Sequence, residues 1–333
     1  MRLFNIIFKS GIDSDDWCMG YITPIYKSGD PKDPGNYRGI TLLSCLGKLF
    51  TSVINNRLTA FVKQNNIVGP EQAGFKKDHS TIDHIFTLKM LIDLYLFKKK
   101  RIYCCFIDYS KAFDTIPRIE LWRKLLNCNI KGKIFQLVQN LYNKAKSSVI
   151  INGKLSDSFP CQTGVRQGDN LSPLLFSIYL HDLEHFLHDK YEGLKLTSEI
   201  QNEHKIVNEM EKYIKLFVLM YADDTILLAE SEKELQNALN AMSDYCEMWK
   251  LQLNVKKMKV VVFSRGKIRK IPNFYFGTTL IDVVDHYNYL GVKFNYNGRF
   301  VKEKQCRYSN GCRAMFALLR KARALSLPID IHL

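Results

Sequence analysis

The stretch LFVLMYADDTILLAE, residues 216–230, places two adjacent carboxylates between two strongly apolar runs. Such runs predict two buried strands, and the short polar interval between them predicts a tight turn. Asp223 and Asp224 would then project from a rigid turn beside the core, where carboxylates cost free energy unless something compensates their charge. The pattern indicates either a cation site or two solvated turn residues, because aspartate is common in hairpin turns.

A second apolar run, IYCCFI at residues 102–107, ends at Asp108. Its continuous apolar character predicts a strand buried on both faces. We expect this strand to lie beside those of the 216–230 stretch, which would bring Asp108 to the paired aspartates. Magnesium takes oxygen ligands, and two cations about 3.5–4 Å apart can activate an attacking oxygen and stabilise a leaving one. A salt-bridged strand end is the simpler explanation of Asp108 alone.

Composition gives broader limits. The 333 residues are 46% hydrophobic and carry 48 Lys and Arg against 33 Asp and Glu, a net charge of +15. This excess indicates a polyanionic partner, most simply nucleic acid, or else a merely soluble basic protein. None of the nine cysteines forms a C-x-x-C pair, which favours reduced thiols inside the cell. Neither a signal peptide nor an apolar stretch of membrane-spanning length is evident.

The order of elements predicts an α+β fold with helices packed on a small sheet. Helical spacing predicts helices at about 46–63, 81–96, 117–127, 131–144 and 303–325, one from Ser172-Pro173 to about His188, and one capped by Ser231 and Glu234 that ends near Trp249. A further strand is expected at 260–263, and hairpin turns at Asn152-Gly153, Gly277 and Asn297-Gly298. Residues 189–212 are polar and predict a surface insertion.

Seven blocks follow one another in a specific order. They are YKSGDPKDPGNYRGITLLS (26–44), QAGFKKDHSTIDHI (72–85), FIDYSKAFD (106–114), GVRQGDNLSPLLF (164–176), YADD (221–224), LNVKKMK (253–259) and YLGV (289–292). Together they strongly resemble the reverse transcriptase domain of non-LTR (LINE-type) retrotransposons, and the resemblance covers nearly the whole chain. YADD alone would be a weak motif, whereas the ordered set is specific.

The resemblance implies a right-hand polymerase, an α+β fold whose palm is a small antiparallel sheet backed by helices. The expected reverse transcriptase domain spans 1–297, and 298–333 would be the start of a truncated thumb helix. Within the domain, the fingers would comprise about 1–100 and 115–165, and the palm about 101–114 and 165–297. No endonuclease is visible in the sequence.

The same resemblance assigns the acidic residues. Asp108, Asp223 and Asp224 would be the catalytic ligands of two Mg²⁺ ions, with Mn²⁺ as an alternative metal. Asp223 would contact both metals directly and Asp224 would support it. Asp114 matches a residue that is structural in the family and is expected outside the metal site.

Substrate contacts follow position by position. Residues expected at the dNTP are Lys27, Arg38, Tyr109, Phe113, Gln167 and Gly168. Arg38 suits bidentate phosphate binding, although a lone loop arginine is usually just solvated. Phe113 would exclude a 2′-hydroxyl by its bulk, unless it is simply a core phenylalanine.

Primer or template contacts are expected at Tyr221, Lys257, Lys259, Tyr289, Leu290 and Gly291. Two positions depart from the family pattern. Met258 replaces the hydroxyl residue of the usual K-T-K block, and Lys76 stands where arginine is common.

These features predict an RNA-directed DNA polymerase that binds an RNA template, a DNA primer or target and dNTPs, with no membrane. The alternatives are another palm polymerase, such as an intron maturase or an RNA-dependent RNA polymerase, and an element remnant that binds nucleic acid without catalysis. Retrotransposon copying would suit the nucleus, but the sequence does not choose between nucleus and cytoplasm, and it gives no oligomeric state.

Overall fold

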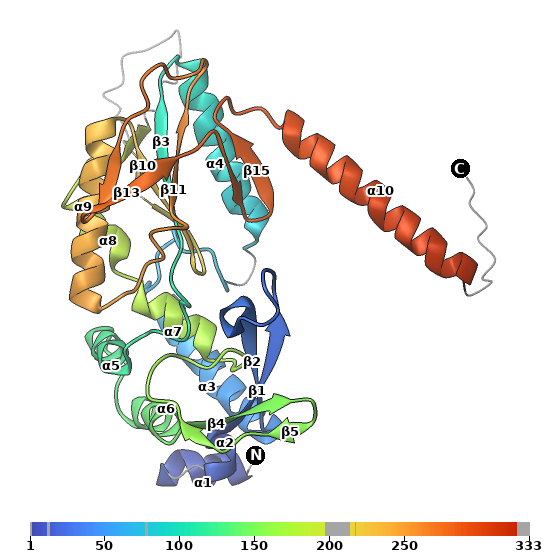
Figure 1. Ribbon diagram of the computed structural model, residues 1–333. Coiled ribbons are helices and arrows are strands. Elements are labelled where there is room, and N and C mark those ends of the chain that lie inside the picture. The colour runs from blue at the N-terminus through green and yellow to red at the C-terminus, as the bar shows by residue number, and fades with distance from the viewer. Residues whose placement is uncertain (1, 12–13, 77–78, 197–213, 217, 325–333) are drawn as a thin grey trace, which may run out of the picture.

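The computed structural model describes residues 2–11, 14–76, 79–196, 214–216 and 218–324. Two sheets form the body, one towards each end of the view, and a long C-terminal helix projects away from the larger sheet (Figure 1). None of the described helices combines the length and apolar character that a membrane crossing requires.

The larger sheet has the strand order β12-β13-β11-β3-β10-β9. Its strands are β12 (Phe274–Phe276), β13 (Thr279–Val283), β11 (Lys259–Phe263), β3 (Ile102–Ile107), β10 (Asp224–Ala229) and β9 (Val218–Tyr221). Every residue of β3 is buried, as its unbroken apolar sequence predicts. β10 pairs with it antiparallel, Thr225 opposite Ile107. The expected adjacency of the two apolar strands is therefore confirmed.

Alternate side chains of β3 pack into two different cores. Cys105 and Ile107 face a core that contains α9 (Glu232–Trp249), α7 (Ser172–Tyr179) and α8 (Leu183–His188). Cys104 and Phe106 face a second core beneath α4 (Thr81–Phe97) and the hairpin of β14 (His286–Tyr289) and β15 (Val292–Asn295). Figure 1 shows α8 and α9 on one side of the sheet and α4 with β15 on the other. Because both faces are covered, the sheet is a rigid base for the loops at its edge.

The smaller sheet belongs to the other end of the molecule. β1 (Met19–Tyr26) pairs antiparallel with β2 (Tyr37–Leu43) and parallel with β4 (Lys146–Ile151), which also pairs with β5 (Lys154–Leu155) and β6 (Phe159–Pro160). Around it lie α1 (Arg2–Ser10), α2 (Asp15–Cys18), α3 (Cys45–Gln64), α5 (Arg118–Asn127), α6 (Lys133–Asn143) and the short turn η1 (Pro34–Asn36). The predicted Asn152-Gly153 hairpin is confirmed, with φ of 49° and 76° at the two turn residues.

Two predicted boundaries are wrong. The helix expected from Ser172 to His188 is two helices, because the chain turns at 180–182 and places Asp182 against the buried Lys124 of α5. The last hairpin turns at Leu290-Gly291, between the paired Tyr289 and Val292, and not at Asn297-Gly298.

Three further expectations are refined. The helix predicted at 46–63 from its apolar spacing is α3, and only part of that apolar set is buried: Phe50, Ile54 and Leu58 are in the core, whereas Leu46, Leu49 and Val53 are exposed. The C-terminal helix is α10 (Val301–Ala324). In the expected insertion at 189–212, Leu194–Leu196 forms β7 and pairs with β8 (Ile214–Leu216), and the part from 197 on lies outside the described residues.

Candidate active site

A cleft of about 670 Å³ lies where the two sheets approach each other. Six segments contribute to its wall: the β1–β2 hairpin, Phe75, the 108–114 loop, the 166–173 loop, the turn between β9 and β10, and the 254–257 loop. All six residues predicted to contact dNTP line it, namely Lys27, Arg38, Tyr109, Phe113, Gln167 and Gly168. Asp108, Asp223 and Lys257 line it too. Segments far apart in the sequence therefore converge at this one cleft.

The three aspartates lie at one edge of the larger sheet. Asp108 directly follows β3, Asp223 lies in the two-residue turn between β9 and β10, and Asp224 is the first residue of β10. Because Thr225 pairs with Ile107, continuing the register sets Asp224 opposite Asp108. Asp108 and Asp223 face the cleft, whereas Asp224 is not part of its lining.

The carboxylates repel one another. Burial first, and then the charges of Asp223 and Asp108, together raise the pKa of Asp224 to about 6. Burial also raises the pKa of Asp108, with Asp223 adding to the effect and Lys257 and Lys27 opposing it. The raised pKa values of these neighbouring acids therefore reflect burial first and mutual repulsion second, and a bound cation would relieve both.

The donor set suits a hard divalent cation, because carboxylate oxygens are the ligands that Mg²⁺ prefers. Among the described residues, however, no three His, Cys, Asp or Glu side chains are grouped closely enough to form a finished metal site. The carboxylate of Asp108 instead lies 3.8 Å from the Lys257 ammonium nitrogen. The chemistry of the donor set therefore fits a divalent cation, although the three carboxylates do not form a closed site here.

Aromatic residues form one wall of the cleft. Phe113 stacks on Phe176 with ring centroids 5.1 Å apart, and its edge contacts Phe75 at 6.1 Å. It is partly buried and also lines the cleft, so its packing fixes the plane that it presents there. Tyr109 is buried, and its hydroxyl lies 3.4 Å from the Thr225 hydroxyl. Tyr109 therefore ties the 108–114 loop to β10 and offers the cleft little side-chain surface.

The loop that carries Gln167 is fixed from behind. The backbone carbonyl of Gln167 accepts a hydrogen bond of 2.9 Å from the Thr41 N–H. Gly168 has a φ of +116°, and a Cβ there would lie 2.5 Å from the Thr41 carbonyl oxygen, so only glycine fits. Arg166 donates to the backbone carbonyls of Trp17 and Cys18.

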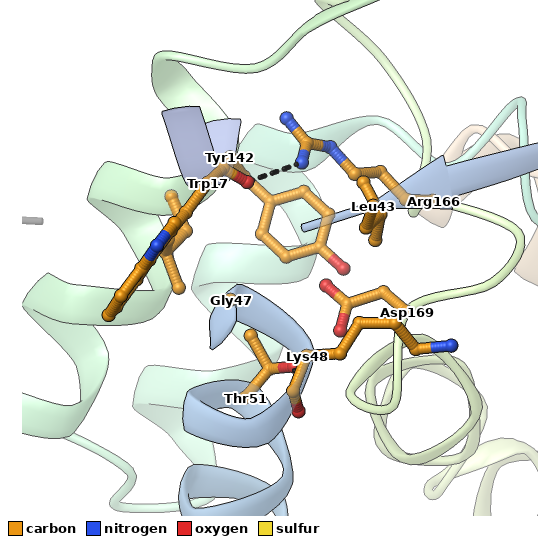
Figure 2. Close-up of a pocket in the computed structure, with 9 residues that line it drawn as sticks. Trp17, Leu43, Gly47, Lys48, Thr51, Tyr142, Arg166 and Asp169 are labelled. Carbon is orange, nitrogen blue, oxygen red and sulfur yellow. Dashed lines mark hydrogen bonds between the residues drawn. The ribbon is translucent and has the colours of Figure 1, made fainter. Parts of the chain in front are cut away.

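Behind this loop, Arg166, Asp169 and Tyr142 surround a cavity of about 10 Å³, roughly the space of one water molecule (Figure 2). Asp169 is buried, and burial raises its pKa, whereas hydrogen bonds from Thr51 and from the Leu171 N–H oppose the rise. These buried contacts join the loop to α3 and α6. They hold the backbone that carries Gln167 in a fixed position at the cleft wall.

Basic residues face the aspartates across the cleft. Burial raises the pKa of both Asp108 and Asp114, and the positive charge of Lys27 opposes the rise at each, which places its ammonium group near both. Arg38 is exposed on β2, opposite Ile25 of β1. The cleft thus has a basic side on the β1–β2 hairpin and an acidic side on the larger sheet.

The predicted primer and template residues are divided by the structure. Lys257 faces Asp108, whereas Lys259 pairs with Asp282 at 2.7 Å, outside the cleft lining. Met258 between them is fully buried, which explains an apolar residue at that position. Leu290 and Gly291 form the tip of the β14–β15 hairpin.

Two tyrosines of this predicted group pack inside the protein. Tyr221 is half buried, with its ring centroid 6.0 Å from that of His84. Tyr289 is 1% exposed and lies in the second core, with its hydroxyl 3.5 Å from the same histidine. The side chain of Tyr289 therefore holds the hairpin in place and is too buried to meet a primer.

Sequence reasoning missed residues that only the fold brings to the site. The Asn254 N–H donates to the Asp108 carbonyl at 2.8 Å, and Asn254 lines the cleft. Phe75, with a φ of 63°, lines it as well. Both lie within or beside blocks already quoted, LNVKKMK and QAGFKKD, and that position was the available signal.

Comparison with known proteins gives consistent matches. The family model described as reverse transcriptase (RNA-dependent DNA polymerase) matches residues 26–294. The chain is 27% identical over 297 residues to the RNA-directed DNA polymerase from mobile element jockey of Drosophila funebris, covering 87% of this chain and 30% of the relative. It is 29% identical over 268 residues to the probable RNA-directed DNA polymerase from transposon BS of Drosophila melanogaster, covering 77% of this chain and 27% of the relative.

A telomerase structure from Candida tropicalis shares the fold. The TM-score is 0.55 at 14% identity, covering 88% of this chain and 57% of the telomerase chain. The likeness confirms the predicted α+β right-hand polymerase architecture. The chain spans about a third or less of the length of the curated relatives named above.

Proposed function

This chain belongs to the reverse transcriptase (RNA-dependent DNA polymerase) family, and we propose that it is the polymerase core of a non-LTR retrotransposon protein, copying an RNA template into DNA from a primer 3′-hydroxyl. The observation that carries the proposal is the cleft itself. Asp108 and Asp223 form its acidic side, and Lys27, Arg38 and Gln167 line the same space. This arrangement suits a triphosphate held between cations and basic side chains.

Asp108, Asp223 and Asp224 would hold the metal. Reverse transcriptases generally use divalent cations, and we assign two Mg²⁺ ions here, with Mn²⁺ able to substitute. When bound, they would activate the primer hydroxyl and neutralise the triphosphate. The contribution of the aspartates is negative charge on a rigid, partly buried sheet edge, where burial and then mutual repulsion raise the pKa of Asp108 and Asp224. Lys257 would leave Asp108 as the cation arrives.

The remaining wall would select and orient the dNTP. Lys27 and Arg38 on the β1–β2 hairpin would bind phosphate oxygens, with Arg38 able to form two parallel hydrogen bonds. Phe113 would lie beneath the sugar and exclude a 2′-hydroxyl, because stacking on Phe176 prevents its ring from moving aside. Gln167, on a loop fixed by Thr41, would donate hydrogen bonds near the sugar and phosphates.

Primer extension tests the proposal directly. The full chain is incubated with an RNA template, a DNA primer, dNTPs and Mg²⁺, and compared with Asp223→Asn and with the control Asp282→Asn, an exposed aspartate paired with Lys259. We expect extension by the wild type and the control, and a loss of about a thousandfold or more for Asp223→Asn. Equal rates for Asp223→Asn and wild type would refute the assignment. Incorporation of rNTPs in place of dNTPs would select an RNA polymerase instead.

A further inference from the structure

We propose that Gln72 is the residue that positions the catalytic turn, acting through the backbone of Ala222 on the adjacent Asp223. The inference rests on the proposed function and adds a residue to it. Gln72 lies outside the cleft lining and has no direct route to the substrate.

The Gln72 side chain contacts both backbone polar groups of Ala222. Its Oε1 accepts a hydrogen bond of 3.0 Å from the Ala222 N–H, and its Nε2 donates one of 3.3 Å to the Ala222 carbonyl. The same Oε1 accepts a further bond of 2.9 Å from the Gly74 N–H. Gln72 is 1% exposed, so water does not compete for these bonds.

The main chain around Gln72 reinforces this clamp. The Met220 N–H donates to the Glu71 carbonyl, and the Ala73 N–H donates to the Met220 carbonyl, each at 2.9 Å. Residues 71–73 thus form a one-residue parallel bridge along β9. A Cβ at Gly74 would lie 2.1 Å from the Ala222 nitrogen, so the two backbones approach as closely as glycine permits.

Ala222 needs such support because its backbone is strained. Its φ is 57°, in the left-handed region that costs a non-glycine residue free energy. A two-residue hairpin with positive φ at its first position normally has glycine there. The amide of Gln72 satisfies both polar groups of the strained residue. It therefore fixes the direction in which the chain leaves Ala222, and with it the direction of the Asp223 side chain.

The experiment compares two glutamines that bind backbone in the same way. Gln236 of α9 accepts from the Tyr275 N–H and donates to the Tyr275 carbonyl, both at 2.9 Å, at a site outside the cleft lining. Gln72→Met and Gln236→Met each remove such a pair and keep the side-chain volume. Gln72→Asn is a second test variant, one methylene too short to span Ala222, in case Gln72→Met does not fold.

Steady-state extension is measured below the melting temperature of each variant, per active site determined by titration. We expect Gln72→Met and Gln72→Asn to lower kcat by about tenfold to a hundredfold. The KM for dNTP should change by less than about twofold, because the cleft residues proposed to bind the nucleotide are unchanged. Gln236→Met should match wild type. A merely structural Gln72 would lower the active fraction and leave kcat per site unchanged, which would overturn the inference.

Hydrogen exchange separates this inference from the proposed function. If the wild type extends no primer, the polymerase assignment fails, and exchange of the Ala222 amide decides the role of Gln72. Protection of that amide in wild type and Gln236→Met, with its loss in Gln72→Met, supports the clamp. Equal protection in all three proteins overturns it.

Discussion

Two tight hairpin turns of this protein each contain a non-glycine residue with a positive φ, and they differ in the residues that surround it. The β9–β10 turn has Ala222 at a φ of 57°, and the β14–β15 turn has Leu290 at 47°. The first is enclosed by Gln72 and Gly74. At the second, a Cβ built on Gly291 meets no described atom within 4 Å, and its carbonyl accepts one long bond of 3.4 Å from Arg307. Enclosure suits a turn that must aim a carboxylate, whereas an open tip suits a turn that meets a partner.

The sharpest test of this contrast is a pair of alanine substitutions. In Gly74→Ala the new methyl meets the Ala222 backbone, which cannot yield without moving the turn. We expect a loss of about 3 kcal/mol in the free energy of unfolding and a roughly hundredfold loss of extension rate. Gly291→Ala meets open space and bears only the strain of its φ of +80°, about 1 kcal/mol, with activity close to wild type. Similar losses of stability and extension rate in the two variants would contradict the contrast between an enclosed and an open turn.

Metal binding should differ with pH because of Asp224. Its pKa of about 6, raised by burial and then by Asp223 and Asp108, means that it is protonated at pH 5 and ionised at pH 7.5. Without metal, ionisation opposes folding, so this contribution to stability is lost as pH rises from about 3.8 to about 6. Added Mg²⁺ should therefore raise the melting temperature more at pH 7.5 than at pH 5.

Asp224→Asn is the matching variant, since it keeps the shape and removes the charge. We expect the gain in melting temperature on adding Mg²⁺ to shrink and to lose most of its pH dependence. A gain as large and as pH-dependent as that of wild type would remove Asp224 from the metal site.

Glu71, whose carbonyl anchors β9, gives a smaller effect on stability. Burial raises the pKa of its carboxyl to about 7, the neighbouring Glu184 adds to the rise, and Lys76 opposes it. The folded state therefore binds a proton that the unfolded state releases near pH 4.5, and this stability is lost as pH rises towards 7. Glu71→Gln should be more stable than wild type at pH 8 by about 1–3 kcal/mol and equal to it near pH 5. Urea denaturation at the two pH values measures the difference.

The smallest effect is expected at the open turn. Leu290→Gly relieves the positive φ but gives up part of a side chain packed against the second core. These opposed changes should leave the free energy of unfolding within about 1 kcal/mol of wild type, and kcat unchanged. A large fall in extension rate with unchanged stability would show that the Leu290 side chain itself contacts the primer.

Local pattern predicted the elements well where one physical signal dominates. The run 102–107 is apolar throughout because both of its faces are buried, and this unbroken apolar pattern predicts the strand β3. Asn152-Gly153 predicts its hairpin because both turn positions need a positive φ, which asparagine and glycine adopt readily. The turn at Leu290-Gly291 was missed because leucine rarely occupies that conformation, while Asn297-Gly298 carried the stronger local signal.

The candidate site divides in the same way. Charged residues in recognisable blocks, such as Arg38 and Asp108, could be proposed from the sequence and do line the cleft. Tyr289 was expected at the primer but packs in a core, and Asn254 was overlooked although it supports Asp108. Side-chain direction depends on pairing between strands distant in sequence, which no local window contains.

The sequence by itself determined the α+β class and the two apolar strands with the three acidic residues that end or join them, because burial and charge leave marks on neighbouring residues; the family followed from the resemblance of its seven ordered blocks. Tertiary structure alone decided which lysine of LNVKKMK faces the aspartates and how the strained Ala222 is held. The reason is distance along the chain: Gln72 and Ala222 are 150 residues apart, and only the folded chain brings them within hydrogen-bond distance.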